Sequence, residues 1–439
     1  MRANWIGLAL LLSACSRHES KPAPAVDSSA SPPAAAAAPS ARFSKPIAAT
    51  RLPDGSVVVA GLVVASSSIV AMRVAADGSA AFAAPVFDGV TWSGGSELRL
   101  LPAPDGAAVV WRGLRGGKPV TELVRLGKAG EIGGAAVDVG AAACAIDDSF
   151  AWFEHGRDGS TRVRARPWSG SSVTDVLTIA GDRDPELVCA AHRLFGLGDG
   201  EDDVTVVSAA GLEAGAPAAI LRDKDFEHDE EREHDVYTVG DSLGIVRVGE
   251  SGTLSVRELG AGAPSAWRTL SRKVSRDEDV VTVDADATSI VIVFTREEAE
   301  GCGGSSALSV RAIRASRFPA GQAPAPETEV LLSPTVCARD LGPFWTGPLD
   351  GSFVVAWVER GHKIEPDAGP SAPISGLAWR SLPGDPSATL QGSVQRVDLP
   401  SDELVSAGCD HAHCYAAALV RPPGSDGMQP EAIRVLSFP

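Results

Sequence analysis

The sequence predicts an all-β fold made of repeated short sheets, and three observations support this prediction. From residue 43 onward, a short turn of Asp, Gly or Ser is followed again and again by an apolar strand. Gly (46 residues) and Pro (31 residues) are frequent, and long runs with helical periodicity are missing. No apolar run after the first fifteen residues reaches the length of about eighteen that a membrane-spanning helix needs, which favours a globular body.

The repeat is clearest in three copies. Residues 53–60, 104–111 and 349–357 read PDGSVVVA, PDGAAVVW and LDGSFVVAW. Gly accepts a positive φ in a tight hairpin turn, and Asp or Ser hydrogen-bonds its own backbone there. The turns of all copies lie at positions 55, 106, 148, 192, 241, 288, 351 and 411, and the copy at 192 is the poorest match.

A second, weaker motif follows many copies and consists of a strand that contains an Arg, followed by a turn. Residues 72–78, 124–130 and 245–252 read MRVAADG, VRLGKAG and IVRVGESG. The same hairpin chemistry explains the Gly and the acidic or hydroxyl residues of these turns.

A repeat of roughly 40 to 60 residues with three or four short strands has the period of a propeller blade. A single four-stranded sheet cannot bury both of its faces, whereas radial stacking buries each sheet against its neighbours. We expect Trp111, Trp152 and Trp357 to fill the gaps between blades. Residues 43–439 therefore resemble a divergent β-propeller without the Trp-Asp or Kelch consensus, which implies a single propeller of about eight, alternatively seven, four-stranded blades.

Closure of such a propeller can be predicted from its two ends. Residues 42–51 and 431–438 both read as strands. Pairing the first and last strands in one blade removes an open sheet edge, so we predict that these strands meet. Two stacked β-sandwich domains are the alternative, because strands at a similar spacing would also build them. Evenly recurring copies without a mid-chain linker favour the propeller.

The first fifteen residues, MRANWIGLALLLSAC, carry a positive charge at Arg2 and a short apolar stretch before Cys15. The stretch is too short to remain as a spanning helix and is typical of a cleaved signal peptide, here residues 1–14. Residues 12–15 resemble the lipobox of bacterial lipoproteins. That resemblance implies lipidation of Cys15, membrane attachment through this lipid, and a place in the bacterial cell envelope. Ser16 rather than Asp after the cysteine implies the outer membrane.

Residues 15–42 comprise the lipidated cysteine and a segment rich in Ser, Ala, Pro and Lys. This composition cannot build a core, so we expect a disordered tether that holds the propeller off the membrane.

The formal net charge of the chain is −17. An acidic surface disfavours phosphate backbones, and no cluster of Lys and Arg with interleaved aromatic residues is present, so the sequence argues against nucleic-acid binding. The strongest charge run, residues 223–235, lacks the pattern of a calcium loop. We interpret it as a solvated loop or a docking surface for a basic partner.

Six cysteines remain besides Cys15, an even number in an exported chain, which predicts three disulfides with fifteen possible pairings. We favour the sequential pairs, and free buried thiols are the alternative. The six residues are Cys144 with Cys189, Cys302 with Cys337, and Cys409 with Cys414.

The densest group of potential metal ligands is the sequence CDHAHC at residues 409–414. Two thiolates and two imidazoles can bind Zn or Cu, so Asp410, His411 and His413 are candidate ligands. The spacing does not fit a zinc finger, and a disulfide across a short hairpin explains the cysteines, so we predict no metal or other cofactor.

Catalytic signatures are missing from the sequence: it has no nucleophile elbow, no HExxH motif, no P-loop and no dinucleotide fingerprint. Arg162, Arg164 and Arg166 alternate on one strand; they either form an inward anion-binding row or face solvent on an outer strand. We predict no catalytic residue.

The sequence favours a binding or scaffolding module with an envelope protein or glycan as its partner. The alternative is a carbohydrate-active enzyme, a lyase or glycoside hydrolase, that uses the propeller funnel.

Overall fold

A computed structural model describes the chain, and the residues that it describes all belong to one compact unit within residues 34–439. The described residues are 42–52, 54, 56–74, 80–127, 130–134, 136–140, 143–156, 160–180, 186–190, 192–199, 204–210, 212, 218–223, 234–249, 252–259, 265–272, 274, 281–286, 288–299, 309–322, 329–333, 336–338, 344–349, 352–365, 369–390, 392–397, 403–409, 414–420 and 431–438. In this part of the chain, no helix has the length and apolar character needed to cross a membrane.

The described residues are almost entirely β-structure, as the sequence predicts, with the single-turn 3-10 helix η1 (Val64–Ser66) as the described exception. Three antiparallel sheets have four strands each, in chain order. They are β10 (Ala143–Ile146), β11 (Ser149–His155), β12 (Ser160–Pro167) and β13 (Thr174–Ala180); β14 (Glu186–Cys189), β15 (Arg193–Asp199), β16 (Val204–Ala210) and β17 (Ala218–Asp223); and β18 (His234–Val239), β19 (Ser242–Val248), β20 (Leu254–Leu259) and β21 (Arg268–Ser271).

A fourth sheet has the same four-strand pattern with one short addition, because β5 and β6 both pair with β7. Its strands are β5 (Val90–Thr91), β6 (Glu97–Ala103), β7 (Gly106–Arg115), β8 (Lys118–Gly127) and β9 (Val137–Asp138).

A fifth sheet of nine strands consists of two four-stranded halves joined by β26, which pairs with both β24 and β28. The first half and the joint are β22 (Val281–Ala285), β23 (Ser289–Ala299), β24 (Ser309–Pro319), β25 (Glu329–Leu331) and β26 (Val336–Ala338). The second half is β27 (Phe344–Leu349), β28 (Ser352–Glu365), β29 (Gly369–Pro383) and β30 (Gln395–Val397).

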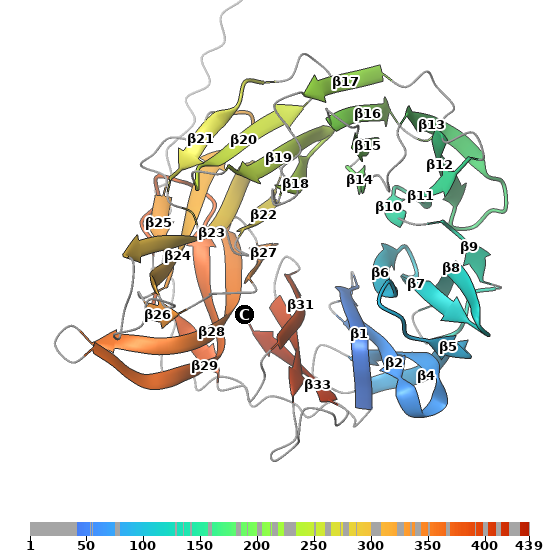
Figure 1. Cartoon of the computed structure of the whole chain (residues 1–439), viewed down its shortest axis with the longest axis horizontal. Helices are drawn as coiled ribbons and strands as arrows, with labels where there is room; N and C mark the ends of the chain where they lie inside the picture. The colour runs from blue at the N-terminus through green and yellow to red at the C-terminus, as the bar shows by residue number, and fades with distance from the viewer. Residues whose placement is uncertain are drawn as a thin grey trace, which may run out of the picture. The chain divides into compact units, whose positions relative to one another are not determined.

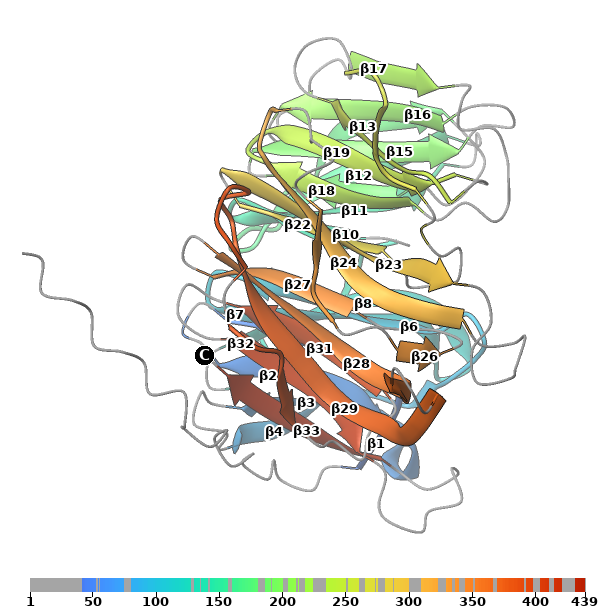
Figure 2. The same ribbon diagram turned by 90° about the vertical axis from the view of Figure 1, so that its left-hand side faces the viewer.

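The sixth sheet has seven strands and joins the two ends of the described chain (Figure 2). It contains β1 (Arg42–Arg51), β2 (Val57–Val63), β3 (Ser68–Val74), β4 (Ala80–Asp88), β31 (Glu403–Cys409), β32 (Cys414–Val420) and β33 (Glu431–Phe438). Strand β1 pairs with β33 at Arg42↔Ala432 and Phe43↔Glu431, so the predicted meeting of these two strands is present. That this pairing closes a ring of about eight blades stays a prediction.

The first strands of successive sheets lie against one another (Figure 1). Strand β1 contacts β6 and β31, β10 contacts β6 and β14, and β22 contacts β18 and β27. The second strand of each sheet or half-sheet is the most buried. Runs of at least five buried residues occur in the second strands β2, β7, β11, β23 and β28. A strand flanked within its own sheet and covered on both faces needs a continuous apolar run, which explains the VVVA, VVW and FVVAW sequences of the repeat.

The three tryptophans predicted to fill gaps between sheets do so. Trp111 is fully buried and packs with residues of both the β1–β4 and β6–β8 strands. Trp152 packs against strands β6 to β8, and Trp357 lies between the β22–β25 and β27–β30 halves. Large rings at these positions bury apolar area that no single sheet can cover.

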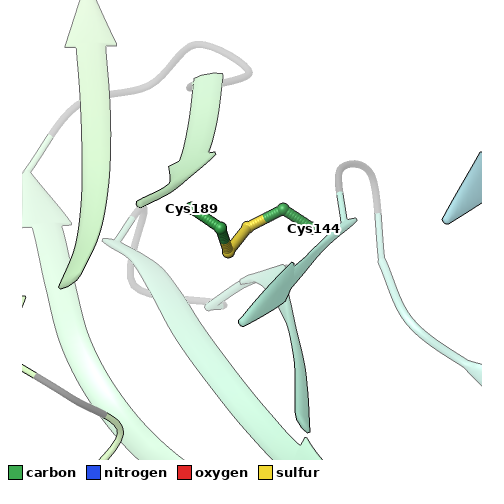
Figure 3. Close-up of a disulfide and its surroundings, with 2 residues drawn as sticks. All are labelled: Cys144 and Cys189. Atoms are coloured by element: carbon green, nitrogen blue, oxygen red, sulfur yellow. A yellow bond between two sulfur atoms is a disulfide. The ribbon is translucent and has the colours of Figure 1, made fainter. Parts of the chain in front are cut away.

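A disulfide links the first strands of two neighbouring sheets (Figure 3). Cys144 of β10 and Cys189 of β14 are bonded, with their Cα atoms 5.9 Å apart. This is one of the three pairs expected from the sequence. Cys414 is also disulfide-bonded, and its backbone pairs with that of Cys409. The side chains of Cys302, Cys337 and Cys409 lie outside the described residues.

Candidate functional site

The turns between the first and second strands of the sheets share one end of the propeller, which we call the turn end. They are the turns around Asp54, Asp105, Asp147, His192, Asp241 and Asp286. Contacts between successive sheets, given below, align four of them. The opposite end, where β1 begins, is called the attachment end, because residue 41 joins Arg42 there.

Two of these aspartates are used by their own turns. The carboxylate of Asp54 accepts hydrogen bonds from the backbone N and the Oγ of Ser56, and these bonds are the largest cause that lowers the pKa of Asp54. Asp286 accepts from the backbone N of Thr288 and of Ser289, each at 2.7 Å. Such bonds stabilise the bend, so the type of residue is explained by turn chemistry.

Arginines from the third strands reach the turn end. The Arg73 guanidinium forms an ion pair with Asp54 and donates from Nε to Ser56 Oγ at 2.8 Å. Arg125 pairs with Asp105 at 2.9 Å. This pairing explains the Arg in the first two examples of the weaker motif. The third example differs, because Arg247 lies on the second strand β19 and stacks over the Trp267 ring at 4.0 Å.

A chain of polar contacts crosses four successive sheets at the turn end. Arg125 donates to the carbonyl of Trp168 in the next sheet at 3.0 Å. In that sheet, Asp147 Oδ1 lies 2.9 Å from Nδ1 of His192, which belongs to the following one. The backbone N of His192 in turn donates to Asp241 Oδ1 at 3.2 Å. The turns of these sheets are therefore held side by side.

His192 is the centre of this chain and is 74% exposed at its side chain, against 42% for Asp147. Asp147 adopts a positive φ of 49°, a conformation that Asp tolerates better than most residues. With Nδ1 directed at Asp147, the imidazole offers its second nitrogen to solvent. The exposed carboxylates and this imidazole can bind cationic groups.

A second group of carboxylates lies on two first strands that contact each other. Burial, the largest cause, together with the nearby charges of Asp286 and of Asp235 on β18, raises the pKa of Asp284 on β22 to about 7. Asp284 and Asp235 each accept from the backbone N of the following residue at 2.8 Å. Among the described residues, no group of three or more His, Cys, Asp or Glu is arranged to hold a metal ion.

Arg317 links the two halves of the nine-stranded sheet. Its guanidinium donates to the carbonyls of Pro383, Asp385, Pro386 and Ala388 at 2.8 to 3.2 Å. The residue is 2% exposed, and burial lowers its pKa. This contact resembles that of Arg125: each Arg lies near the end of a third strand and binds the loop after the next third strand along the chain, in the following sheet for Arg125 and in the second half of the same sheet for Arg317.

The arginines that alternate along one strand lie on the third strand of their sheet. Arg162, Arg164 and Arg166 lie on β12, the third strand of its sheet, where Arg164 forms ion pairs with Glu154 and Asp175. They therefore follow the outer-strand alternative. Three groups of candidates lie outside the described residues. They are the metal candidates Asp410, His411 and His413, the lipidation residue Cys15, and residues 224–233 of the acidic run.

Sequence reasoning missed the role of His192. The copy at 192 is the poorest because Ala191-His192 replaces the usual Asp-Gly or Asp-Ser turn. The same replacement supplies the imidazole that contacts Asp147, while the backbone N of His192 donates to Asp241. The available signal was therefore the departure from the repeat, read together with aspartates in the copies before and after it.

No protein-family model matches this sequence, and no curated protein matches it. Solved structures do. The WD40 domain of SCAP from fission yeast is similar with a TM-score of 0.50 at 10% identity, over 90% of this chain and 95% of that chain. At this identity the likeness shows the fold alone, which is a β-propeller.

Two further structures are similar at lower scores. The β-propeller domain of the Trilobed protease from Pyrococcus furiosus has a TM-score of 0.45 at 10% identity, over 78% of this chain and 95% of that chain. The polysaccharide lyase Uly1 has a TM-score of 0.43 at 9% identity, over 89% of this chain and 88% of that chain. At these scores neither likeness carries an argument about this chain.

Proposed function

We propose that this chain is an envelope-anchored lipoprotein whose β-propeller is a binding or scaffolding module. The observation that carries the proposal is the turn end, where contacts through His192 align the turns of successive sheets and present Asp105, Asp147 and Asp241 on one surface. A rigid row of carboxylates on aligned turns suits an extended partner surface of positive charge.

The lipid on Cys15 supplies the anchor in this proposal, and two or more acyl chains hold a protein far better than one. The test is membrane fractionation of the wild-type chain and of Cys15→Ala. The wild type is expected in the membrane fraction and the variant in the soluble fraction. Unchanged membrane retention of the variant would sink the lipoprotein assignment.

The partner in this proposal is an envelope protein with a basic surface. Crosslinking in the intact native envelope, followed by pull-down and mass spectrometry, is expected to give one stoichiometric partner. The double variant Asp105→Lys/Asp241→Lys reverses two charges at the turn end and is expected to lose that adduct. Glu97→Lys is the matched control, because Glu97 lies at the start of β6, toward the attachment end. Equal loss in both would contradict a role of the turn end.

The first strands differ in the groups that they carry: β18 and β22 carry Asp235 and Asp284, whereas β10 carries no acid–base group. Strand β10 contains Ala143, Cys144, Ala145 and Ile146; Cys144 is disulfide-bonded, and the other three are apolar. Along β10 the propeller therefore offers no general acid or base for glycan cleavage. Cleavage of a glycan by the purified chain would instead favour the carbohydrate-active alternative.

A further inference from the structure

The direction of β1 fixes where the preceding chain joins the propeller. Arg42 pairs with Ala432, and further along the strand Ser44 pairs with Leu62, just before η1. The strand then runs to Arg51, next to the turn that holds Asp54. Any anchor carried by residues before Arg42 therefore attaches at the end of the first sheet that lies opposite its Asp turn.

The attachment end of the first two sheets exposes two large apolar side chains. Val64 on η1 is 62% exposed, and Trp92, which follows β5, is 43% exposed. The loops that carry them are bonded to each other, because the backbone N of Val90 donates to the carbonyl of Ser67 at 2.9 Å. The apolar pair is thus presented by one connected surface rather than by separate loops.

Basic side chains border this apolar pair. Strand β5 pairs with the end of β7, where Arg115 and Lys118 flank the hairpin turn. Arg115 is 37% exposed while paired with Glu122 at 2.6 Å, and Lys118 is exposed. Asp88 and Glu97 are carboxylates of the same region; Asp88 is exposed, and the Glu97 side chain is 36% exposed. An indole beside aliphatic and basic groups is the combination enriched where proteins meet a bilayer.

The turn end lacks this combination among its described residues. Two exposed apolar side chains do occur there, Ile132 at 47% and Val173 at 49%. Ile132, however, follows Glu131 and pairs with Leu126 near the turn of Asp105, and these carboxylates disfavour an anionic lipid surface. The two ends therefore differ in their fitness for a membrane.

We propose that Val64 and Trp92 rest on the bilayer that holds the lipid of Cys15, so that the turn end points away from the membrane. This inference rests on the proposed lipoprotein function. A weak contact suffices, because the anchor makes it intramolecular. A tether of about 26 residues, as expected from the sequence, keeps this end of the propeller near the membrane, at an effective concentration in the millimolar range.

The test uses the full-length lipidated protein in vesicles of phosphatidylethanolamine and phosphatidylglycerol. A polarity-sensitive NBD dye is attached through Val64→Cys, and in a matched control through Asp241→Cys at the turn end. The wild-type chain treated in the same way gives the background from its own cysteines. We expect at least twofold brighter, blue-shifted emission from position 64, quenched by spin-labelled lipids, and no change at position 241.

A second variant separates contact from anchoring. Trp92→Ser, combined with the dye at position 64, is expected to lose at least half of the lipid quenching while the protein still sediments with the vesicles and keeps its melting temperature. Position 64 remaining in water while the protein sediments would overturn the bilayer contact and leave the lipoprotein proposal standing. Failure of the lipidated protein to sediment at all would overturn both.

Discussion

At the turn end the sheets present aspartates, whereas at the attachment end of the first two sheets they present Val64, Trp92 and Lys118. Both ends are made by hairpins of the same strands. The turns between first and second strands are tight and select Asp and Gly, since these residues stabilise the bend. The loops at the other end are freer in length and sequence. Turn chemistry alone therefore explains some of the aspartates at the turn end. A functional role needs to be sought in the aspartates that do not bond their own turns.

The aspartates of the turn end divide accordingly. Asp54 and Asp286 bond their own turns, so local structure accounts for them. Asp105 is 75% exposed and bonds a neighbouring strand, and Asp147 and Asp241 contact His192 of the sheet between them. These three project beyond their own turns, and they are the residues whose replacement is expected to affect a partner.

The largest expected effect is on the free energy of unfolding, and it distinguishes a buried tryptophan from an exposed one. Trp357→Ala is expected to lower the free energy of unfolding by about 3 to 5 kcal/mol, because it opens a cavity between two sheets. Trp92→Ala at the attachment end is expected to change it by less than about 0.5 kcal/mol. Chemical denaturation of both variants measures the difference. Equal losses would mean that the attachment end contributes to the core.

The disulfide of the first strands gives the next effect. The double variant Cys144→Ser/Cys189→Ser is expected to lose about 2 to 4 kcal/mol of stability, because the crosslink closes a long loop in the unfolded chain. The fold itself is expected to persist, since the sheets remain packed. Denaturation with and without reductant measures this loss. A wild type that is equally stable in both conditions would contradict it.

The pH dependence of stability follows from Asp284. Its pKa is raised to about 7 in the folded chain, so its favourable contribution is complete below the unfolded value and is lost as the pH rises through about 7. Between pH 5 and pH 8 this amounts to about 3 kcal/mol. Asp284→Asn is expected to flatten that fall, whereas Asp105→Asn is expected to leave it unchanged. Melting temperatures between pH 5 and pH 8 measure this difference. A fall in the melting temperature of Asp284→Asn as steep as that of the wild type would contradict the prediction.

The smallest effect on stability is expected at the turn end itself. His192→Ala removes an exposed side-chain contact and is expected to cost less than about 1 kcal/mol. The same variant is expected to weaken partner crosslinking, because the Asp147 turn loses its side-chain contact with the next sheet, while the backbone N of residue 192 still donates to Asp241. Thermal unfolding and envelope crosslinking are measured together. A large loss of stability with crosslinking intact would make His192 a structural residue only.

Much of the fold could be predicted from the sequence, because a repeated turn and an apolar second strand are local signals. The strand boundaries 42–51 and 431–438 and the places of Trp111, Trp152 and Trp357 followed from them. The site could not be predicted in the same way. Contacts such as Arg125 with Trp168, or His192 with Asp147 and Asp241, join residues more than forty positions apart, and their geometry depends on how the sheets stack.

Photocrosslinking in the native envelope tests whether the turn end binds a protein partner while the attachment end faces the bilayer. A benzophenone amino acid is placed at position 241 on the turn end and, separately, at position 64 on the attachment end. We predict a discrete protein adduct from position 241, lost on Asp105→Lys, and lipid adducts from position 64. Lipid adducts from position 241, or the same protein adduct from both positions, would contradict this prediction.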